Sequence, residues 1–399
     1  MTILQSMKLR LTDLWVTYCR EWRAILADKG VMLFFFVVPF IYPFLYSALY
    51  GNEGVRESPL VVVDKSSSAL SREFTRRVDA SPDVAVVAHV STESEAYSLV
   101  ASEKAYGILV IPEDFSKDLE QGRQAQVNLH TTFAAALYYK AYSLATAEVA
   151  LTMGREIEAR RHPNVSTEAT QIAVRPIESE WITPHNPQSG FQGFLLPGIL
   201  VLILQQTLLL GVSMLRGTEW EKGARHFYYP RVGGHYVSLM RLFLGRALCY
   251  LTIYGVVSCF VLILAPQIFG IPQLTDFVSY LTLLLPLLLS MTFFACFWGL
   301  FARSRETSML VWVWTSVPFL FLTGLSWPLS AIPAPLKALG YLIPSTPGVQ
   351  AFVAINSMGA SLHEILPQYL TLWIQALVYL ALCVVYQRYL LRKAEDPAK

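Results

Sequence analysis

Six stretches of the chain are apolar for long enough to cross a membrane as helices. A membrane-spanning helix needs roughly 20 consecutive apolar residues, and lipid favours continuous helices because it offers the backbone no hydrogen-bond partners. The stretches are Val31–Tyr50, Phe194–Leu215, Ala247–Phe269, Phe277–Ala302, Ser308–Pro328 and Tyr369–Leu391. None of them carries Asp, Glu, Lys or Arg near its centre. The pattern therefore predicts an α-helical polytopic membrane protein with six transmembrane helices.

Lysine and arginine are unevenly distributed among the connecting segments. More than half of the 31 lysines and arginines lie in Met1–Gly30, Arg216–Arg246, Arg303–Thr307 and the tail from Arg388. The two other short loops hold only Lys337. Because short cytoplasmic loops carry an excess of these residues, we expect a multi-pass protein of the plasma (inner) membrane with both termini cytoplasmic. Residues 51–193 then lie outside, since domains of that length cross regardless of charge.

Residues 51–193 follow a different pattern, in which short apolar runs alternate with amphipathic stretches. The runs that predict strands are Leu60–Asp64, Val84–Val90, Tyr106–Ile111, Gln126–Thr131 and Ile172–Ile177. The stretches that predict helices are Ser66–Val78, Ser91–Lys104, Phe115–Gln121 and Ala134–Arg161, two of them opened by serines that suit a helix start. This alternation favours an inserted extracytoplasmic α/β domain with a small, partly parallel sheet.

The predicted parts follow one another simply. In chain order they are a cytoplasmic entry helix (1–30), the first transmembrane helix (31–50), the extracytoplasmic α/β domain (51–193), a five-helix transmembrane part (194–391) and a cytoplasmic tail (392–399). Within the five-helix part, residues 216–246 form a cytoplasmic loop. Residues 329–368 form a proline-rich outside loop that suits helices entering and leaving the membrane from one side.

Composition and motifs exclude several kinds of chemistry. Charged residues make up 15% of the chain, against about 25% in soluble domains, and the net charge of +2 provides no basic field for nucleic acid. The outside domain has no catalytic or metal-binding spacing and no cysteine, so a disulfide cannot staple it. The dipeptide Gly-Lys never occurs, so the chain lacks a P-loop. We expect no catalytic site, no metal and no cofactor in this chain.

Apolar residues recur at helical spacing before the first span, at Leu11, Leu14, Trp15, Tyr18, Trp22, Ile25 and Leu26. Charged residues fall mostly on the other side of the helix that this spacing predicts. A helix of this kind with two tryptophans suits the membrane interface. It also suits a lever that contacts a cytoplasmic partner, and the two interpretations are compatible.

Two charged segments near the predicted cytoplasmic side resemble motifs of a known family. The first is Arg216-Gly217-Thr218-Glu219-Trp220-Glu221, after the second span, and the second comprises Arg20, Glu21 and Asp28, before the first span. Together with the Pro-rich loop and the order of parts over the whole chain, they resemble the membrane subunits (permeases) of type-2 ABC exporters. The closest branch has a large extracytoplasmic domain after the first span. The usual leucine-rich continuation of the first motif is replaced by Trp220 and Ala224-Arg225-His226.

The resemblance implies a transport subunit that a separate cytoplasmic P-loop ATPase energises, with ATP and magnesium bound by that partner. It implies that both charged segments couple to the ATPase. It also implies a second permease copy or a paralogue in the assembly, and leaves room for a periplasmic adaptor.

Polar residues inside the predicted spans are candidates for the substrate pathway. They are Gln205, Gln206 and Thr207 in the second span, Thr315 and Ser316 in the fifth, and Gln375 in the sixth. Two adjacent amides are unfavourable in lipid without partners, and they point about 100° apart on a helix. The alternative is that these residues bond neighbouring helices or their own backbone. Many aromatic rings and no central charge suit an amphipathic or hydrophobic cargo.

Two other classes of function remain open at this point. One is a membrane receptor or secretion scaffold whose outside α/β domain binds a ligand or protein, although four further spans and a Pro-rich loop are seldom needed for that. The other is a membrane enzyme, which the lack of acids and histidines near span centres disfavours.

Overall fold

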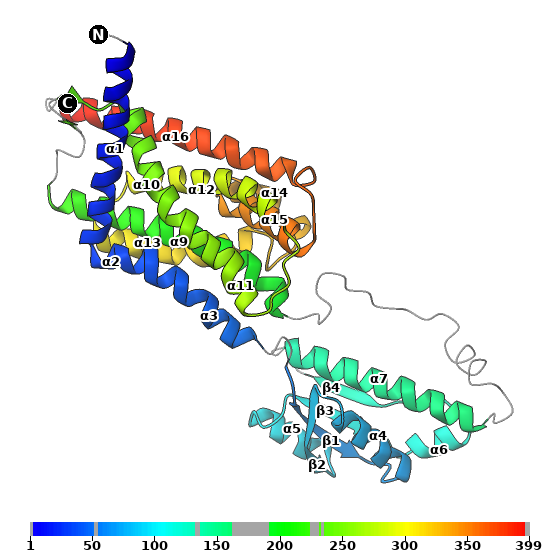
Figure 1. The fold of residues 1–399 in the computed structure, drawn as a ribbon. Coiled ribbons are helices and arrows are strands. Elements are labelled where there is room, and N and C mark those ends of the chain that lie inside the picture. Colours follow the sequence, from blue (N-terminus) through cyan, green and yellow to red (C-terminus); the bar gives the residue numbers. More distant parts are fainter. Residues whose placement is uncertain are drawn as a thin grey trace. The chain divides into compact units, whose positions relative to one another are not determined.

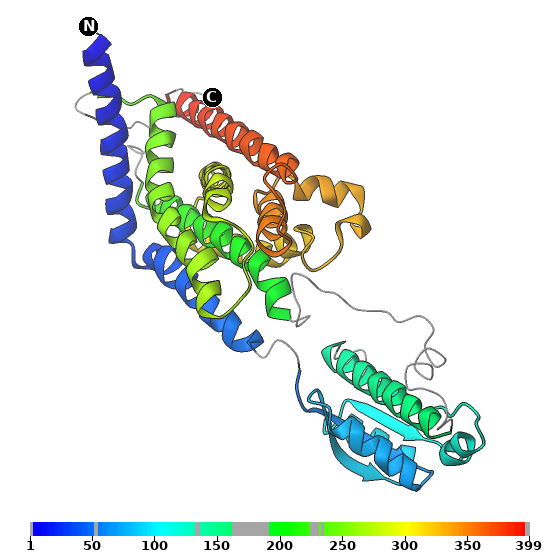
Figure 2. The same cartoon turned by 45° about the vertical axis from the view of Figure 1, so that its right-hand side comes forward.

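The computed structural model describes residues 3–51, 55–131, 136–161, 191–223, 231–232 and 235–395. The chain forms two compact units, Met1–Gly51 with Thr183–Lys399, and Asn52–Ile182. Both units are drawn in Figures 1 and 2. The strand predicted over residues 172–177 lies outside the described residues.

The first unit is helical. Its elements are α1 (Ile3–Ala27), α2 (Lys29–Met32), the π-helical η1 (Leu33–Val37), α3 (Val38–Tyr50), α9 (Phe191–Glu221), β5 (Arg231–Val232), β6 (His235–Tyr236), α10 (Leu239–Cys259), the π-helical η4 (Phe260–Leu264), α11 (Ala265–Ile268), α12 (Phe277–Gly299), α13 (Arg305–Leu322), the 3-10 turn η5 (Leu329–Ala331), α14 (Ala334–Gly340), α15 (Ser345–Ser357) and α16 (Leu366–Glu395). The strands β5 and β6 pair as a short antiparallel hairpin.

Among the described residues, five helical segments are long and apolar enough to cross a membrane. They are Lys29–Tyr50, Gln192–Glu221, Leu239–Ile268, Phe277–Gly299 and Leu366–Lys393. The fifth predicted span forms α13, which begins earlier than predicted, at Arg305, and ends at Leu322. Its 18 residues include Arg305 and Glu306, and it is not among the five segments. The helices α14 and α15 meet at 85° and would make a sixth span if they are counted as one.

The helix α9 lies at the centre of this unit, packed against α3, α12, α13 and α15. Its span is apolar all round and 94% of it is buried, as expected for a helix surrounded by others. Gly211 gives room to the ring of Phe35, because a Cβ there would lie 2.0 Å from the ring. At its two ends, Gly217 approaches Ser304 and Gly198 approaches Leu325, so α13 runs antiparallel along α9.

The second unit is an α/β fold. Its strands are β1 (Ser58–Asp64), β2 (Val84–Val90), β3 (Gly107–Ile111) and β4 (Asn128–Thr131), and its helices are α4 (Ala69–Asp79), α5 (Glu93–Ala101), α6 (Phe115–Glu120) and α7 (Ala136–Arg161). The sheet order is β2-β1-β3-β4, with β1 parallel to β2 and β3, and β4 antiparallel to β3. The predicted partly parallel sheet is therefore confirmed.

The two faces of this sheet are covered by different helices. Leu60 and Val62 of β1 pack with residues of α4, α6 and α7, whereas Val61 and Val63 pack against α5. A strand that is covered on both faces reads as a continuous apolar run, as β1 does. The helix α5 is capped by Thr92 and not by Ser91, and Ser68 caps α4. The predicted fold class, a polytopic helical protein with an inserted α/β domain, is confirmed.

Candidate coupling site and pathway

The helix α1 packs along α10 with its polar side inward. Asp13, Thr17 and Glu21, spaced one turn apart, are all buried. Asp13 pairs with Arg241 of α10, and Gly245 allows close approach because a Cβ there would lie 2.8 Å from Thr17 Cβ. The apolar residues Leu11, Trp15 and Leu26 are exposed. The predicted apolar stripe is therefore divided: Leu11, Trp15 and Leu26 face away from the helical unit, whereas Ile25 lies in its core and Tyr18 and Trp22 pack against that core.

Glu21 lies at the centre of a buried charge cluster that joins α1, α9 and α10. Arg216 Nη2 donates to Glu21 Oε1 at 2.9 Å and Arg216 Nη1 donates to Glu219 Oε2 at 2.9 Å. Arg246 Nε lies 3.5 Å from Glu21 Oε2, and the Tyr250 hydroxyl donates to Glu21. Burial alone would raise the pKa of Glu21, but the two arginines and the tyrosine overcome it and hold this pKa below its usual value. The carboxylate therefore stays charged inside the protein.

A second cluster joins the start of the first span to the start of α13. Both terminal guanidinium nitrogens of Arg305 donate to Asp28, Nη1 to Oδ2 at 2.7 Å and Nη2 to Oδ1 at 2.8 Å. Asp28 also caps α2 by accepting from the backbone of Gly30 and Val31. Burial raises the pKa of Asp28, but these bonds outweigh it and the net pKa is lowered. The pair is a bidentate, charge-assisted contact of the strong kind.

Each residue of the Arg-Gly-Thr segment has a distinct contact at this junction. Arg216 holds Glu21, as described above. Gly217 lets α9 touch the chain before α13, because a Cβ there would lie 2.6 Å from the carbonyl carbon of Ser304. Thr218 Oγ1 lies 3.5 Å from Arg305 Nη1. Three residues further on, Glu221 Oε1 accepts from the backbone N–H of Arg305 at 2.8 Å.

Seven of the nine predicted coupling residues therefore meet at one junction. Arg20 and Trp220 lie at the periphery of the two clusters. Arg20 is exposed on α1, where its charge helps to lower the pKa of Glu21, and Trp220 is exposed with the Arg303 guanidinium 6.0 Å from its ring centre. Sequence reasoning missed the partners Arg246, Tyr250 and Arg305. Arg246 stands at the boundary of a predicted span. Arg305 lies in a predicted loop in which the sequence indicates only positive charge. Their pairing depends on tertiary contacts that one sequence does not reveal.

The two adjacent amides of α9 are buried. Gln205 is 1% exposed and Gln206 8% exposed, and neither amide has a hydrogen-bond partner within the part of the chain that the structure describes. Gln206 lies eleven residues before Gly217, and Thr315 lies eleven residues after Ser304. Eleven residues are close to three helical turns, about 16 Å, so both residues lie at one level along the α9–α13 contact.

The other pathway candidates bond within the protein. Tyr254 of α10 donates to Thr207 at 3.0 Å, and Thr207 donates to the carbonyl of Ile203. Thr315 and Ser316 each donate to a carbonyl one turn back in α13. Gln375 of α16 donates to the carbonyl of Tyr341, at the bend between α14 and α15. Gln375 thereby satisfies a backbone group that the bend leaves without a helical partner.

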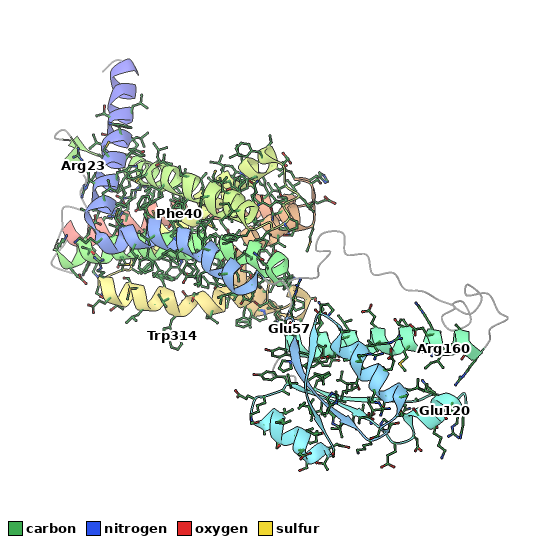
Figure 3. All side chains as sticks on the ribbon, turned by 60° about the horizontal axis from the view of Figure 1, so that its bottom comes forward. Arg23, Phe40, Glu57, Glu120, Arg160 and Trp314 are labelled. Carbon is green, nitrogen blue, oxygen red and sulfur yellow. The ribbon has the colours of Figure 1, made fainter. Side chains whose placement is uncertain are left out.

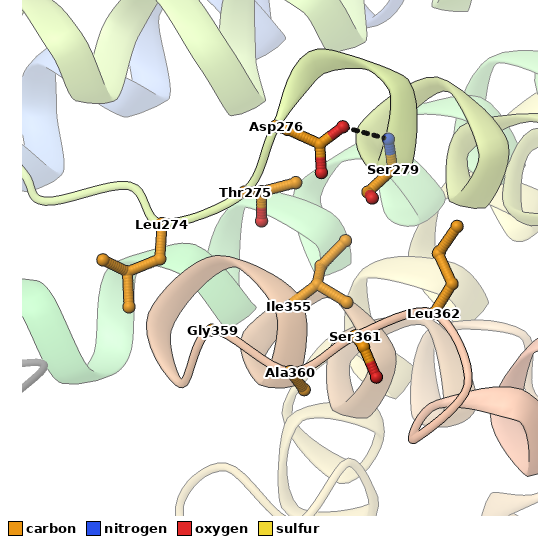
Figure 4. Close-up of a pocket in the computed structure, with 9 residues that line it drawn as sticks. All are labelled: Leu274, Thr275, Asp276, Ser279, Ile355, Gly359, Ala360, Ser361 and Leu362. Carbon is orange, nitrogen blue, oxygen red and sulfur yellow. Dashed lines mark hydrogen bonds between the residues drawn. The ribbon is translucent and has the colours of Figure 1, made fainter.

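A separate cavity of about 310 Å³ lies between the segment before α12 and the connection from α15 to α16 (Figure 4). Asp276 on its wall accepts from the backbone N–H of Val278 and Ser279, so this carboxylate caps α12. The cavity contains none of the predicted site residues. Across the described residues, no group of three or more His, Cys, Asp or Glu side chains is arranged to hold a metal ion.

Comparison with known protein families places these observations in context. A family model described as "ABC-2 family transporter protein" matches residues 29–385, from the first residue of α2 into α16. The match therefore covers the first four candidate spans, most of the last one and the α/β unit between the first two. No curated protein matches the chain closely enough to count as a relative.

Proposed function

We propose that this chain, which belongs to the ABC-2 transporter family, exports an amphipathic or hydrophobic cargo across the plasma (inner) membrane. The chain is the membrane subunit of an ABC transporter, and a partner ATPase subunit supplies the energy. In this proposal the partner binds ATP and magnesium. One observation carries the proposal: two charge clusters tie α1 and the start of the first span to the ends of α9 and α13, which hold most of the pathway candidates.

The ATPase docks on the side of the membrane where α1 begins and α9 ends. Both termini are cytoplasmic in this arrangement, and the α/β unit is extracytoplasmic, where a periplasmic adaptor would reach it. The buried ion pair makes α1 and α9 move together, because separating them would break the Glu21–Arg216 contact and leave both buried charges with fewer partners in the interior. Closure of the ATPase therefore displaces the second span directly.

The pathway runs along the α9–α13 contact. Gln206 and Thr315 lie there at one level, and the two unpartnered amides of Gln205 and Gln206 provide hydrogen-bonding groups for a polar part of the cargo. Apolar and aromatic side chains around them accommodate the rest of the cargo. No charged residue lies near the centre of the spans, which fits a cargo that carries no buried charge of its own.

A second copy of the chain, or a paralogue, completes the pathway by covering α13. The outward side of α13 is apolar and exposed, and Trp314 projects from it with 82% of its surface exposed (Figure 3). Alternating closure between the two copies would then open the space along α9 first to one side of the membrane and next to the other.

The test begins with the tagged chain purified in mild detergent, from which we expect a P-loop ATPase to co-purify. Inverted membrane vesicles that contain the complex should take up a lipophilic fluorescent dye when ATP is added. Replacing both amides (Gln205→Ala/Gln206→Ala) should lower uptake at least tenfold without dissociating the ATPase. The matched control is Thr282→Ala in α12, which is not a pathway candidate, donates its hydroxyl to the carbonyl of Val278 in its own helix and should leave uptake within twofold.

Arg216→Ala tests the coupling side of the proposal. We expect the ATPase to hydrolyse ATP with dye uptake lost, or to dissociate from the chain. Unchanged uptake in both the amide variant and Arg216→Ala, each shown to be folded, would contradict the assigned roles. If no ATPase accompanies the folded chain, a receptor or secretion scaffold becomes the better interpretation of the α/β unit.

A further inference from the structure

We propose that Arg305 is a positioning residue that clamps α13 to the start of the first span through Asp28. The clamp makes the first span, α9 and α13 move as one body when the ATPase closes. This inference rests on the proposed function, because its consequence is the amount of cargo moved per ATP. It adds a residue, Arg305, that neither the family motifs nor the sequence patterns indicated.

Arg305 contacts three elements at once. Its guanidinium holds both carboxylate oxygens of Asp28, at the start of the first span. Its guanidinium also lies near Thr218, and its backbone N–H donates to Glu221, both at the end of α9. Arg305 is itself the first residue of α13. A displacement of α2 or α9 is therefore transmitted to α13 at its first turn.

Two glycines leave space for Arg305, and any larger residue at either position would collide with it. A Cβ at Gly30 would lie 2.1 Å from Arg305 Nη2, and a Cβ at Gly217 would lie 2.7 Å from the Arg305 backbone nitrogen. Real Cβ atoms do not approach that closely, so both positions require glycine while the clamp is closed. The backbones of α2 and α9 can thus lie close to Arg305 because both positions are glycine.

The clamp differs from the Glu21 cluster in its exposure. The Arg305 side chain is 34% exposed, whereas the Arg216 side chain is 5% exposed. Removing Arg305 therefore leaves Asp28 at a water-accessible edge with its two backbone N–H donors still in place. We expect Arg305 variants to fold, which makes the clamp testable by substitution. The Glu21 cluster binds α1 to α9 and α10. The clamp between Asp28 and Arg305 attaches α13 to this group of helices.

The first test measures dye uptake per ATP hydrolysed in vesicles that contain the whole complex. Asp28→Asn keeps the helix cap, since Asn caps as well as Asp, but removes the charge. Asp28→Asn and Arg305→Gln should each lower uptake per ATP at least fivefold, with ATP hydrolysis within twofold of wild type. The double variant should be no worse than either single variant, because both remove the same contact. The matched control is Arg303→Gln, an exposed neighbour that should leave the ratio unchanged.

The second test does not depend on transport. Spin labels at Ala27→Cys and Thr307→Cys, both exposed, report the distance between the end of α1 and the start of α13. The labels are placed in the complex with the partly exposed Cys19 and Cys259 replaced by Ser. Wild type should give one narrow distance with and without ATP, and Arg305→Gln should broaden or shift it when ATP binds.

Two outcomes would overturn the clamp: an unchanged label distance in Arg305→Gln, or single variants whose losses multiply in the double variant. If wild-type vesicles take up no dye, the proposed function fails, and the label distance still decides whether the clamp exists.

Discussion

Gly217 determines how closely α9 approaches the chain before α13. A Cβ at this position would lie 2.6 to 2.7 Å from three backbone atoms of Ser304 and Arg305, which have no flexible end that can move aside. Gly217→Ala should therefore lower the stability of the helical unit by about 1–3 kcal/mol, as overpacking of an interior does. Gly255→Ala in α10 is the matched control, because a Cβ there meets nothing within 4 Å. Thermal unfolding of the purified chain would measure both changes.

Equal melting temperatures for the two variants would mean that α9 and the segment before α13 can move apart without loss of stability. The close contact at Gly217 would then contribute nothing to the stability of the helical unit. A lower melting temperature for Gly217→Ala alone would assign the close approach to this glycine.

The sequence reveals the identity of the junction residues but not their pairing. Arg216, Gly217 and Thr218 stand out because charge and glycine interrupt the end of an apolar stretch. Nothing local connects Arg216 to Glu21, which is 195 positions away, or Arg305 to Asp28, which is 277 positions away. Such pairs follow from the packing of whole helices, so they become visible only in three dimensions.

At the scale of the element, α1 departs from the usual rule for amphipathic helices. Periodicity correctly predicts a helix before the first span, but the rule that the apolar side faces the protein holds only for Tyr18, Trp22 and Ile25 and not for Leu11, Trp15 and Leu26. The inward side carries Asp13, Thr17 and Glu21 because α10 presents Arg241, Gly245 and Arg246 to it. The sequence alone does not reveal a polar partner surface. The exposed stripe at Leu11, Trp15 and Leu26 is thus left for the membrane interface or the ATPase.

Docking of α1 on α10 can be tested through Gly245. A Cβ at this position would lie 2.8 Å from Thr17 Cβ and 3.1 Å from the carbonyl of Leu14, so Gly245→Val should push α1 away. Released from α10, α1 should be cleaved by trypsin after the exposed Arg20 and Arg23 at least fivefold faster. The control is Gly255→Val, which places the same side chain on the same helix where a Cβ meets nothing within 4 Å. Equal cleavage rates in the two variants would argue that α1 does not depend on this contact.

At the scale of the whole molecule, the proposed second copy accounts for the exposed side of α13. Leu310, Trp314, Val317 and Phe321 recur at helical spacing on this side, and all are more than half exposed. Lipid would cover such residues equally well, and α16 presents a comparable apolar side at Leu377. Exposure alone therefore does not separate a lipid-facing helix from an interface between copies.

Cysteine cross-linking separates the two cases. In a chain with Cys19 and Cys259 replaced by Ser, Val317→Cys should form a cross-linked dimer with a short thiol-reactive linker, because a two-fold axis beside α13 brings position 317 of both copies together. Leu377→Cys, equally apolar and 65% exposed against 58% for Val317, should remain monomeric on denaturing gels. Cross-linking at both positions, or only at Leu377, would contradict the placement of the second copy on α13. Cross-linking of Val317→Cys only to a different co-purifying membrane subunit would instead identify the partner as a paralogue that covers the same helix.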